Sequence, residues 1–261
     1  MVIYGINPVV EALKAGRVTE LWIGDSHAAR VLEAAAAARR AGVAVRRVHG
    51  SELDRLARGG VHQGVVATVE EPRNYGVADL VAGAGAVPLL VVLDGIEDPH
   101  NVGAILRTVD AAGGGGVIRQ SRHAAKLGGA AAKAAAGALG HVRVADVVNV
   151  ARAIEELKES GVWTVGLAGD SPKRYDDMDL TVPTAFVLGA EGSGLRRLVR
   201  ERCDWLVSIP MRGHVGSLNV SVAAGIALFE AVRQRERAGV RVEAGPGGRS
   251  QESQKKPLVG R

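Results

Sequence analysis

The stretch LLVVLDGIEDPHNVGAILRTVDAAG, residues 89–113, decides the fold class. Its first six residues form a nearly unbroken apolar run, which is typical of a strand buried on both faces of a sheet. Apolar residues at helical spacing follow the sequence Asp98-Pro99-His100-Asn101, where Asn101 is a suitable helix N-cap. A buried strand that leads into a capped helix is the building unit of an open, parallel α/β sheet.

The same alternation continues to about residue 238. Short apolar runs predict further buried strands at 115–119, 141–144, 162–168, 185–189 and 205–210. Helices are expected between them at 123–140, 149–161 and 195–202, and a final helix over 217–238. In this last helix one apolar stripe, expected to pack on the core, contains Leu218, Val222, Ile226, Phe229 and Val232. Residues 88–238 are therefore predicted to form one open α/β domain.

Residues 1–71 show a separate alternation of helices and strands, so we expect a small α/β domain there. Its helices are predicted from Asn7-Pro8, over 29–42 and over 51–58 with Ser51 as the cap, and its strands at 19–24, 43–49 and 65–70. The Pro- and Gly-rich residues 72–87 are expected to be a linker that contains one helical turn. Residues 239–261 are rich in Gly, Ser, Gln, Lys and Pro, which predicts a disordered basic tail.

Composition places the chain among globular cytoplasmic proteins. Its 261 residues are 47% hydrophobic and 23% charged, which allows a sizeable core and argues against disorder throughout. No apolar run approaches the roughly 20 residues of a membrane helix, and the N-terminus does not resemble a signal peptide. The single cysteine, Cys203, excludes internal disulfides and cysteine-cluster metal sites. We therefore expect a cytoplasmic location and no membrane partner.

Charge alone does not identify a partner. The formal net charge of +5 favours a polyanion, but +3 of it lies beyond Gly239, where five basic residues accompany two acidic ones. A tail of this kind is often only a solvated chain end. Aromatic residues make up only 3% of the sequence, which argues against a platform on which bases stack.

Ligands of open α/β sheets bind beyond the carboxyl ends of the strands, so we examined the segments that follow each predicted strand. No P-loop and no dinucleotide fingerprint is present. Each segment has an ordinary structural interpretation, such as a helix cap, a surface arginine or a tight turn. Together they could also surround a nucleoside, with adenine held by backbone groups and apolar side chains. The candidate residues in these segments are Asn101, Arg107, Leu167, Gly169, Gly189, Glu191, Ile209, Ser217, Leu218 and Asn219.

Three blocks in order carry a specific resemblance. They are DPHNVGAILRTVDAAG (98–113), VLGAEGSGL (187–195) and IPMRGHVGSLNVSVAAGIALFEA (209–231). They resemble the signature motifs of the SpoU (TrmH) family of RNA ribose 2′-O-methyltransferases. IYGINPVVEALKAGRVTELWI (3–23) and VHQGVVATVE (61–70) resemble the N-terminal domain of its RlmB-type branch, which methylates a guanosine ribose of 23S rRNA.

The resemblance implies a fold, a cofactor and partners. The fold is the SPOUT class, an open sheet with a C-terminal trefoil knot, preceded by a small substrate-binding domain. S-adenosylmethionine is the methyl donor, no metal is required, and the enzymes act as homodimers. The partner is 23S rRNA, before or during assembly of the subunit, and Arg46, Arg47 and His62 of the first domain are candidate phosphate contacts.

The resemblance also assigns roles to individual residues. The polar catalytic group corresponds to Asn101, Arg107, Glu191, Ser217 and Asn219. The cofactor contacts correspond to Gly189, Ile209 and Leu218, and the glycine loop after residues 162–168 adds Leu167 and Gly169. Arginine keeps its proton at neutral pH, so we expect Arg107 to hold a phosphate and the forming alkoxide rather than to act as a base.

Three alternatives remain at this point. The substrate could be another rRNA ribose or a tRNA ribose. The chain could be an RNA-binding module without activity. It could also be an ordinary doubly wound enzyme that uses a nucleotide or NAD, although the dinucleotide fingerprint is missing.

Overall fold

The computed structural model describes residues 2–14, 16–25, 28–69, 75–122, 127, 130–136 and 138–240. The predicted tail lies outside the described residues from 241 onward. Two compact units divide the chain: residues 1–73 group with 126–140, and residues 74–125 group with 141 onward. Within the described ranges, no helix has the length and apolar character needed to cross a membrane.

The smaller unit is built around a four-stranded mixed sheet. Its elements are β1 (Val2–Tyr4), α1 (Ile6–Lys14), β2 (Val18–Ile23), α2 (Ala29–Arg40), β3 (Ala44–Arg47), α3 (Gly50–Leu56) and β4 (Val65–Val69). The strand order is β1-β4-β2-β3, in which only the β2–β3 pair is parallel. Strand β1 was not predicted, because three residues are too few to show a strand periodicity. It is a strand because it pairs with β4, which is distant in the sequence.

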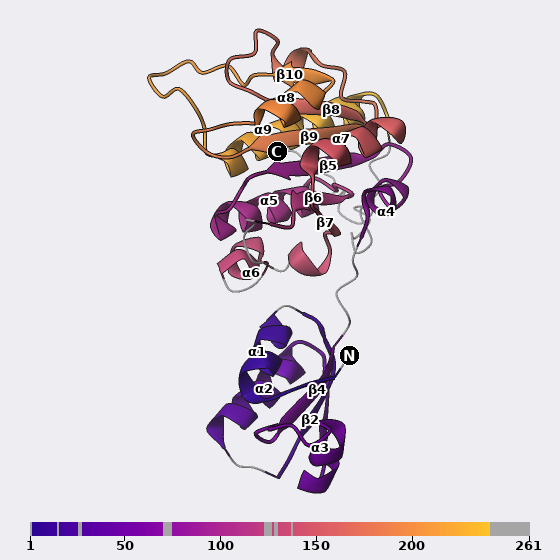
Figure 1. Cartoon of the computed structure of the whole chain (residues 1–261), viewed down its shortest axis with the longest axis vertical. Helices are drawn as coiled ribbons and strands as arrows, with labels where there is room; N and C mark the ends of the chain where they lie inside the picture. The colour runs from indigo at the N-terminus through magenta and orange to yellow at the C-terminus, as the bar shows by residue number, and fades with distance from the viewer. Residues whose placement is uncertain are drawn as a thin grey trace, which may run out of the picture. The chain divides into compact units, whose positions relative to one another are not determined.

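The larger unit contains a six-stranded parallel sheet, which confirms the predicted α/β class (Figure 1). Its order is β10-β8-β9-β5-β6-β7. The strands are β5 (Leu89–Asp94), β6 (Gly116–Gln120), β7 (Val144–Val147), β8 (Trp163–Leu167), β9 (Thr184–Gly189) and β10 (Trp205–Val207). Its helices are α4 (Val77–Ala82), α5 (Pro99–Ala111), α7 (Val150–Glu159), α8 (Arg197–Arg202) and α9 (Val220–Arg237). Helix α6 (Ala130–Ala135) groups with the smaller unit.

Helices cover both faces of this sheet. On one face α4, α7 and α8 pack on alternate strand residues such as Leu90 and Val92 of β5. On the opposite face α5 and α9 pack against each other, and α9 contacts β9, where Phe186 is buried. Leu80 of α4 belongs to the first of these cores, although the sequence placed it in a linker.

Several predicted boundaries are wrong. The strand expected at 141–144 is β7, which starts at Val144 because that residue pairs with Val117 of β6. The N-cap of α5 is Asp98, whose Oδ1 accepts a hydrogen bond from the backbone N–H of His100 at 2.9 Å. Asn101, predicted to be the cap, instead lies buried in the first turn.

The caps of two other helices also differ from the expectation. Helix α9 is capped by Asn219, whose Oδ1 accepts from the N–H of Ser221 at 2.9 Å, and not by Ser217. Helix α3 is capped by His49 and not by Ser51. In both cases several polar side chains stand near the helix start, and the tertiary fold selects which one reaches the first backbone donors.

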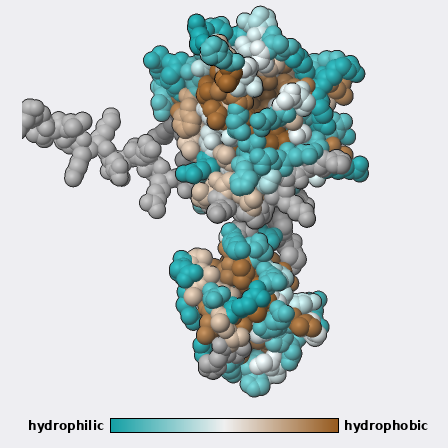
Figure 2. Space-filling model, turned by 90° about the vertical axis from the view of Figure 1, so that its left-hand side faces the viewer, coloured by the Kyte–Doolittle hydropathy of each residue, from teal (hydrophilic) through white to brown (hydrophobic). Residues whose placement is uncertain are grey.

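The predicted core stripe of α9 is not its buried face. The side of α9 that is buried carries mainly small residues, including Ala224, Ala227 and Ala231. Val222 and Phe229 of the stripe are half exposed, at 50% and 49%. Figure 2 shows hydrophobic residues gathered on one face of the larger unit. Small residues dominate the buried face, which fits the close packing of α9 on α5.

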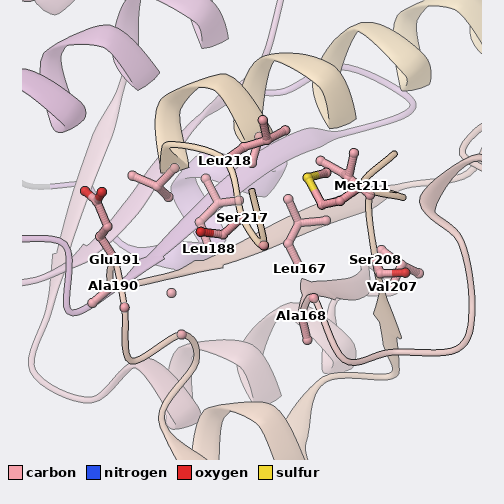
Figure 3. A pocket seen from close by; sticks show the side chains of 18 of the residues that line it. Leu167, Ala168, Leu188, Ala190, Glu191, Val207, Ser208, Met211, Ser217 and Leu218 are labelled. Atoms are coloured by element: carbon pink, nitrogen blue, oxygen red, sulfur yellow. The ribbon is translucent and has the colours of Figure 1, made fainter. Parts of the chain in front are cut away.

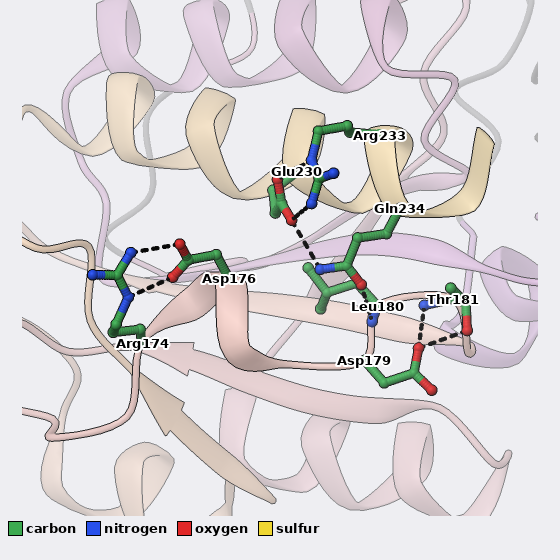
Figure 4. A network of polar contacts seen from close by, with 8 residues as sticks. All are labelled: Arg174, Asp176, Asp179, Leu180, Thr181, Glu230, Arg233 and Gln234. Carbon is green, nitrogen blue, oxygen red and sulfur yellow. Dashed lines mark hydrogen bonds and ion pairs between the residues drawn. The ribbon is translucent and has the colours of Figure 1, made fainter. Parts of the chain in front are cut away.

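A buried arginine joins the end of α9 to two other segments. Arg235 is 1% exposed and donates to the carbonyl oxygens of Leu180 (2.9 Å), Val182 (2.8 Å), Val87 (2.9 Å) and Pro88 (3.1 Å). Gln234 beside it accepts from the N–H of Leu180 at 2.9 Å (Figure 4). Burial lowers the pKa of Arg235 to about 10, so the side chain stays charged at neutral pH.

The substitution Arg235→Met is expected to lower the free energy of unfolding by about 3 kcal/mol, because it leaves buried carbonyl oxygens without donors. Urea denaturation of the purified protein measures this. Arg233→Met is the matched control: Arg233 lies on the same helix but pairs with Glu230 at a partly exposed position, so we expect a loss below about 1 kcal/mol. Equal losses in the two variants would contradict the assignment.

Candidate functional site

A cavity of about 470 Å³ lies at the carboxyl ends of β8, β9 and β10 (Figure 3). Its lining comes from residues 167–169, 188–192 with 194, 207–211, and 216–218 with 220 and 223. Two of the three sequence motifs therefore form its walls together with the glycine loop after β8. The volume lies within the range of small-molecule sites, roughly 300–1,000 Å³.

The loop between β9 and α8 folds back on the end of its own strand. A Cβ at Gly189 would lie 2.1 Å from the carbonyl carbon of Gly194 and 2.3 Å from the nitrogen of Leu195. The backbone N–H of Gly194 donates to the carbonyl of Ala190 at 2.8 Å. Gly192 and Gly194 adopt φ values of +80° and +67°, a region that favours glycine. This tight turn leaves backbone rather than side chains on one wall of the cavity.

A buried carboxylate fixes the far end of that loop. Asp94, the last residue of β5, is fully buried and accepts from the backbone N–H of Arg196 at 2.8 Å and from its Nε at 2.6 Å. The guanidinium also forms an ion pair with Asp94. The sequence shows that Asp94 ends an otherwise apolar strand. It does not show that the partner of Asp94 is Arg196, 102 residues further along the chain.

The loop after β8 is held at two points. Ser171 donates from its Oγ to the carbonyl of Leu206 at 2.7 Å. Asp170 forms a two-pronged ion pair with Arg200 of α8, with both N–O distances at 2.9 Å. Hydrogen bonding from Arg200 lowers the pKa of Asp170, so this carboxylate is ionised at neutral pH. The loop after β8 is thus tied to β10 and to α8.

The structure gathers seven of the ten predicted site residues in this lining. All five predicted cofactor contacts line the cavity: Leu167, Gly169, Gly189, Ile209 and Leu218. Among the predicted catalytic residues, Glu191 and Ser217 also line it. The sequence missed Ser208, Met211 and Ala223, which carry no distinctive signal of their own.

The other three predicted residues lie outside the lining. Asn219 donates from Nδ2 to Oδ1 of Asn101 at 2.9 Å, which ties the start of α9 to the first turn of α5. Arg107 lies further along α5 with an exposed side chain. Within the described part of the chain, no hydrogen bond or ion pair engages Arg107, so its guanidinium is available to a ligand or another molecule.

Within the described residues, neither a thiol nor a group of metal ligands lies in the cavity lining. Burial raises the pKa of Cys203 to about 12, so its thiol is protonated and unreactive at neutral pH. In the described ranges, no group of three or more His, Cys, Asp or Glu side chains is placed to hold a metal ion.

Two family models match successive parts of the chain. Residues 88–229 match the family model described as the SpoU rRNA Methylase family. Residues 2–75 match the model described as RNA 2′-O ribose methyltransferase substrate binding.

Curated relatives match over most of the chain. The 23S rRNA (guanosine-2′-O-)-methyltransferase RlmB of Pseudomonas syringae is 44% identical over 239 residues, covering 89% of this chain and 95% of the relative. The enzyme of the same name from Yersinia pestis is 46% identical over 239 residues, covering 90% and 97%. The crystal structure of the SpoU methyltransferase AviRb from Streptomyces viridochromogenes, in complex with AdoMet, matches with a TM-score of 0.63 and 26% identity, covering 91% of both chains.

Proposed function

The chain belongs to the SpoU rRNA methylase family, and we propose that it transfers a methyl group from S-adenosylmethionine to the ribose 2′-OH of a guanosine in 23S rRNA. The observation that carries this proposal is the cavity itself. Loops from the second and third family motifs and the β8 loop enclose it. The first motif is joined to the third by the hydrogen bond between Asn101 and Asn219.

The lining fits the methyl donor. Leu167, Leu188, Ile209 and Leu218 offer apolar surface to an adenine ring, and the glycine-rich turns expose backbone groups that can bind its edge. Glu191 adds a carboxylate that suits the positive charges of the donor. No metal ligand set is required for this chemistry.

Methyl transfer places distinct demands on the protein. S-adenosylmethionine supplies a methyl group on a sulfonium; the C–S electron pair stays on sulfur as the 2′ oxygen takes the methyl and releases its proton to water or a neighbouring group. Arg107 holds the adjacent phosphate and the developing negative charge on oxygen. Asn101 and Glu191 orient the arginine across the proposed dimer, while Ser217 and Asn219 shape the loop and the nucleotide pocket.

The trefoil knot is part of the proposal. Strand β10 pairs with β8 on one side, through Trp205 opposite Val165. Just beyond its end, the N–H of Ser208 donates to the carbonyl of Lys173 at 2.8 Å, and the N–H of Tyr175 donates to Ser208 at 3.0 Å. The chain near β10 thus runs between β8 and the segment that leaves β8, as expected where a C-terminal segment threads an earlier loop.

We also propose a homodimer. The half-exposed Val222 and Phe229 lie seven residues apart, on one face of α9, and a second copy would bury them. A partner is also a source of groups that complete the site, since Arg107 lies outside the lining formed by its own chain. Sedimentation velocity that shows only a monomer at micromolar concentration would refute the dimer.

The substrate proposal is tested in cells. Mapping 2′-O-methyl groups in rRNA and tRNA from a deletion strain should reveal one lost methyl group, on a 23S rRNA guanosine. Loss of a methyl group at another ribose would show that the substrate is a different nucleotide. An unchanged map would favour the alternative that the chain is an RNA-binding module without activity. We also propose that the reaction takes place in the cytoplasm, before or during assembly of the subunit.

The first unit is proposed to bind the rRNA. Of the three predicted phosphate contacts, only Arg47 is exposed without a partner among the described residues. Arg46 forms an ion pair with Glu20. His62 is used internally, since its Nδ1 accepts from the N–H of Gly64 at 3.0 Å and its Nε2 lies 3.1 Å from Asp54.

Removal of residues 1–73 is expected to preserve the affinity for S-adenosylmethionine within about threefold and to abolish most methyl transfer to rRNA, because phosphate contacts supply much of the RNA affinity. The cut spares Val77 and Leu80, which belong to the core of the larger unit. Calorimetry and methyl incorporation measure the two effects. Full activity of the truncated protein would disprove the role of the first unit; a chain without the tail after Gly239 is the control and should lose far less.

A further inference from the structure

The charge of the cavity is carried by one side chain. Among the described residues that line it, Glu191 alone is ionisable; the rest are glycine, alanine, proline, aliphatic side chains, Met211, Ser208 and Ser217. Figure 3 places Glu191 at one end of the cavity, and Ser208 and Met211 at the other. A ligand in this cavity therefore meets one negative charge in otherwise uncharged surroundings.

Nothing in the described part of the chain neutralises this carboxylate. The arginines that follow it along the chain are already engaged: Arg196 with Asp94, Arg197 with Glu201, and Arg200 with Asp170. No hydrogen bond or ion pair to Glu191 is formed within the described residues. Its charge is therefore available to a ligand in the cavity and to the water around it.

The donor and its by-product differ by one positive charge. S-adenosylmethionine carries a sulfonium, which becomes a neutral thioether in S-adenosylhomocysteine, while the adenosine and amino acid parts stay the same. A carboxylate near the sulfur attracts the first compound and gains little from the second. Apolar walls strengthen this difference because they exclude water, although the exposure of Glu191 limits its size.

We propose that Glu191 determines the preference of the cavity for the sulfonium donor over the neutral by-product, and so helps the by-product to leave after each transfer. This role rests on the proposed function. The proposal adds a second role for Glu191 besides the positioning of Arg107, namely to set the relative affinity of the cavity for the two ligands.

The test is the ratio of two dissociation constants. Calorimetry on the full-length protein with S-adenosylmethionine and with S-adenosylhomocysteine gives this ratio without any turnover. In Glu191→Gln the preference for the donor should fall by about three- to tenfold, mainly through weaker donor binding. Glu201→Gln is the matched control, because Glu201 lies outside the lining and pairs with Arg197; its ratio should equal that of the wild type.

A third ligand distinguishes a direct charge effect from an indirect change in the cavity. Sinefungin carries a protonated amine in place of the methyl sulfonium, so Glu191→Gln should weaken it as it weakens the donor. Equal changes in affinity for charged and neutral ligands would overturn the proposal, as would an unchanged ratio. A wild-type protein that binds none of the three ligands would instead refute the proposed function.

Discussion

Replacement of Arg107 by alanine is expected to slow methyl transfer by about a hundred- to a thousandfold, while the affinity for S-adenosylmethionine stays within about threefold of the wild type. The physical reason is the position of this side chain. It is exposed on α5, outside the cavity lining, so it contributes little to cofactor binding. In the proposed mechanism, its charge acts on the RNA phosphate and on the oxygen that becomes negative during transfer. Single-turnover methyl incorporation and calorimetry measure the two quantities.

Two further variants test whether the effect is specific to the guanidinium group at position 107. Arg107→Lys keeps the charge but loses the planar fork, so it should recover only a small part of the rate. Arg197→Ala removes another exposed arginine, one that pairs with Glu201 on α8, and should leave the rate nearly unchanged. Near-normal turnover in Arg107→Ala would show that the assigned role is wrong. A parallel loss of cofactor affinity would place the arginine in the binding site instead.

The second large effect is expected from Gly189→Val, which should lower cofactor affinity by about a hundredfold or more. The sequence suggests that a side chain here would collide with the ligand. The structure gives a nearer obstacle, since even a Cβ would stand 2.1 Å from the backbone carbon of Gly194. The turn from Ala190 to Gly194 must therefore open, and the wall that it forms must move. The obstacle is backbone, which cannot move aside as the end of a flexible side chain can.

Folding and binding must be separated for this variant. Circular dichroism and a thermal melt report whether the variant is folded, and calorimetry on the folded fraction reports the cofactor affinity. Gly213→Ala is the control, because a Cβ at Gly213 meets nothing within 4 Å and the residue lies outside the lining. Unchanged affinity in a folded Gly189→Val protein would contradict the proposed role of the turn.

Local signals in the sequence were strong enough to predict most elements. The run from Leu89 to Asp94 is β5 with the predicted bounds, because six successive buried residues suit only a strand covered on both faces. The motif residues at the ends of β8, β9 and β10 were placed correctly at one edge, because parallel strands bring their carboxyl ends together. Predictions failed where several residues could serve the same local purpose, as in the choice between Asp98 and Asn101 as a cap.

Long-range partners could not be predicted from the sequence. Arg235 looks like one more basic residue in the last turn of a helix, yet it is buried because four carbonyl oxygens from two distant segments surround it. The half-exposed Phe229 fits a core stripe by spacing, but the buried face of α9 is the one that carries Ala224, Ala227 and Ala231. In each case the decisive contact joins residues that are far apart in the chain.

The sequence by itself determined the α/β class, the family and the identity of the candidate residues, because these depend on local periodicity and on short motifs. Only the tertiary structure decided which candidates share one cavity and which stand outside it. Glu191 and Ser217 line the cavity, whereas Asn101 and Asn219 brace two helix starts. The physical reason is that a cavity is formed by loops from separate strands, and their distances depend on how the sheet and its helices pack.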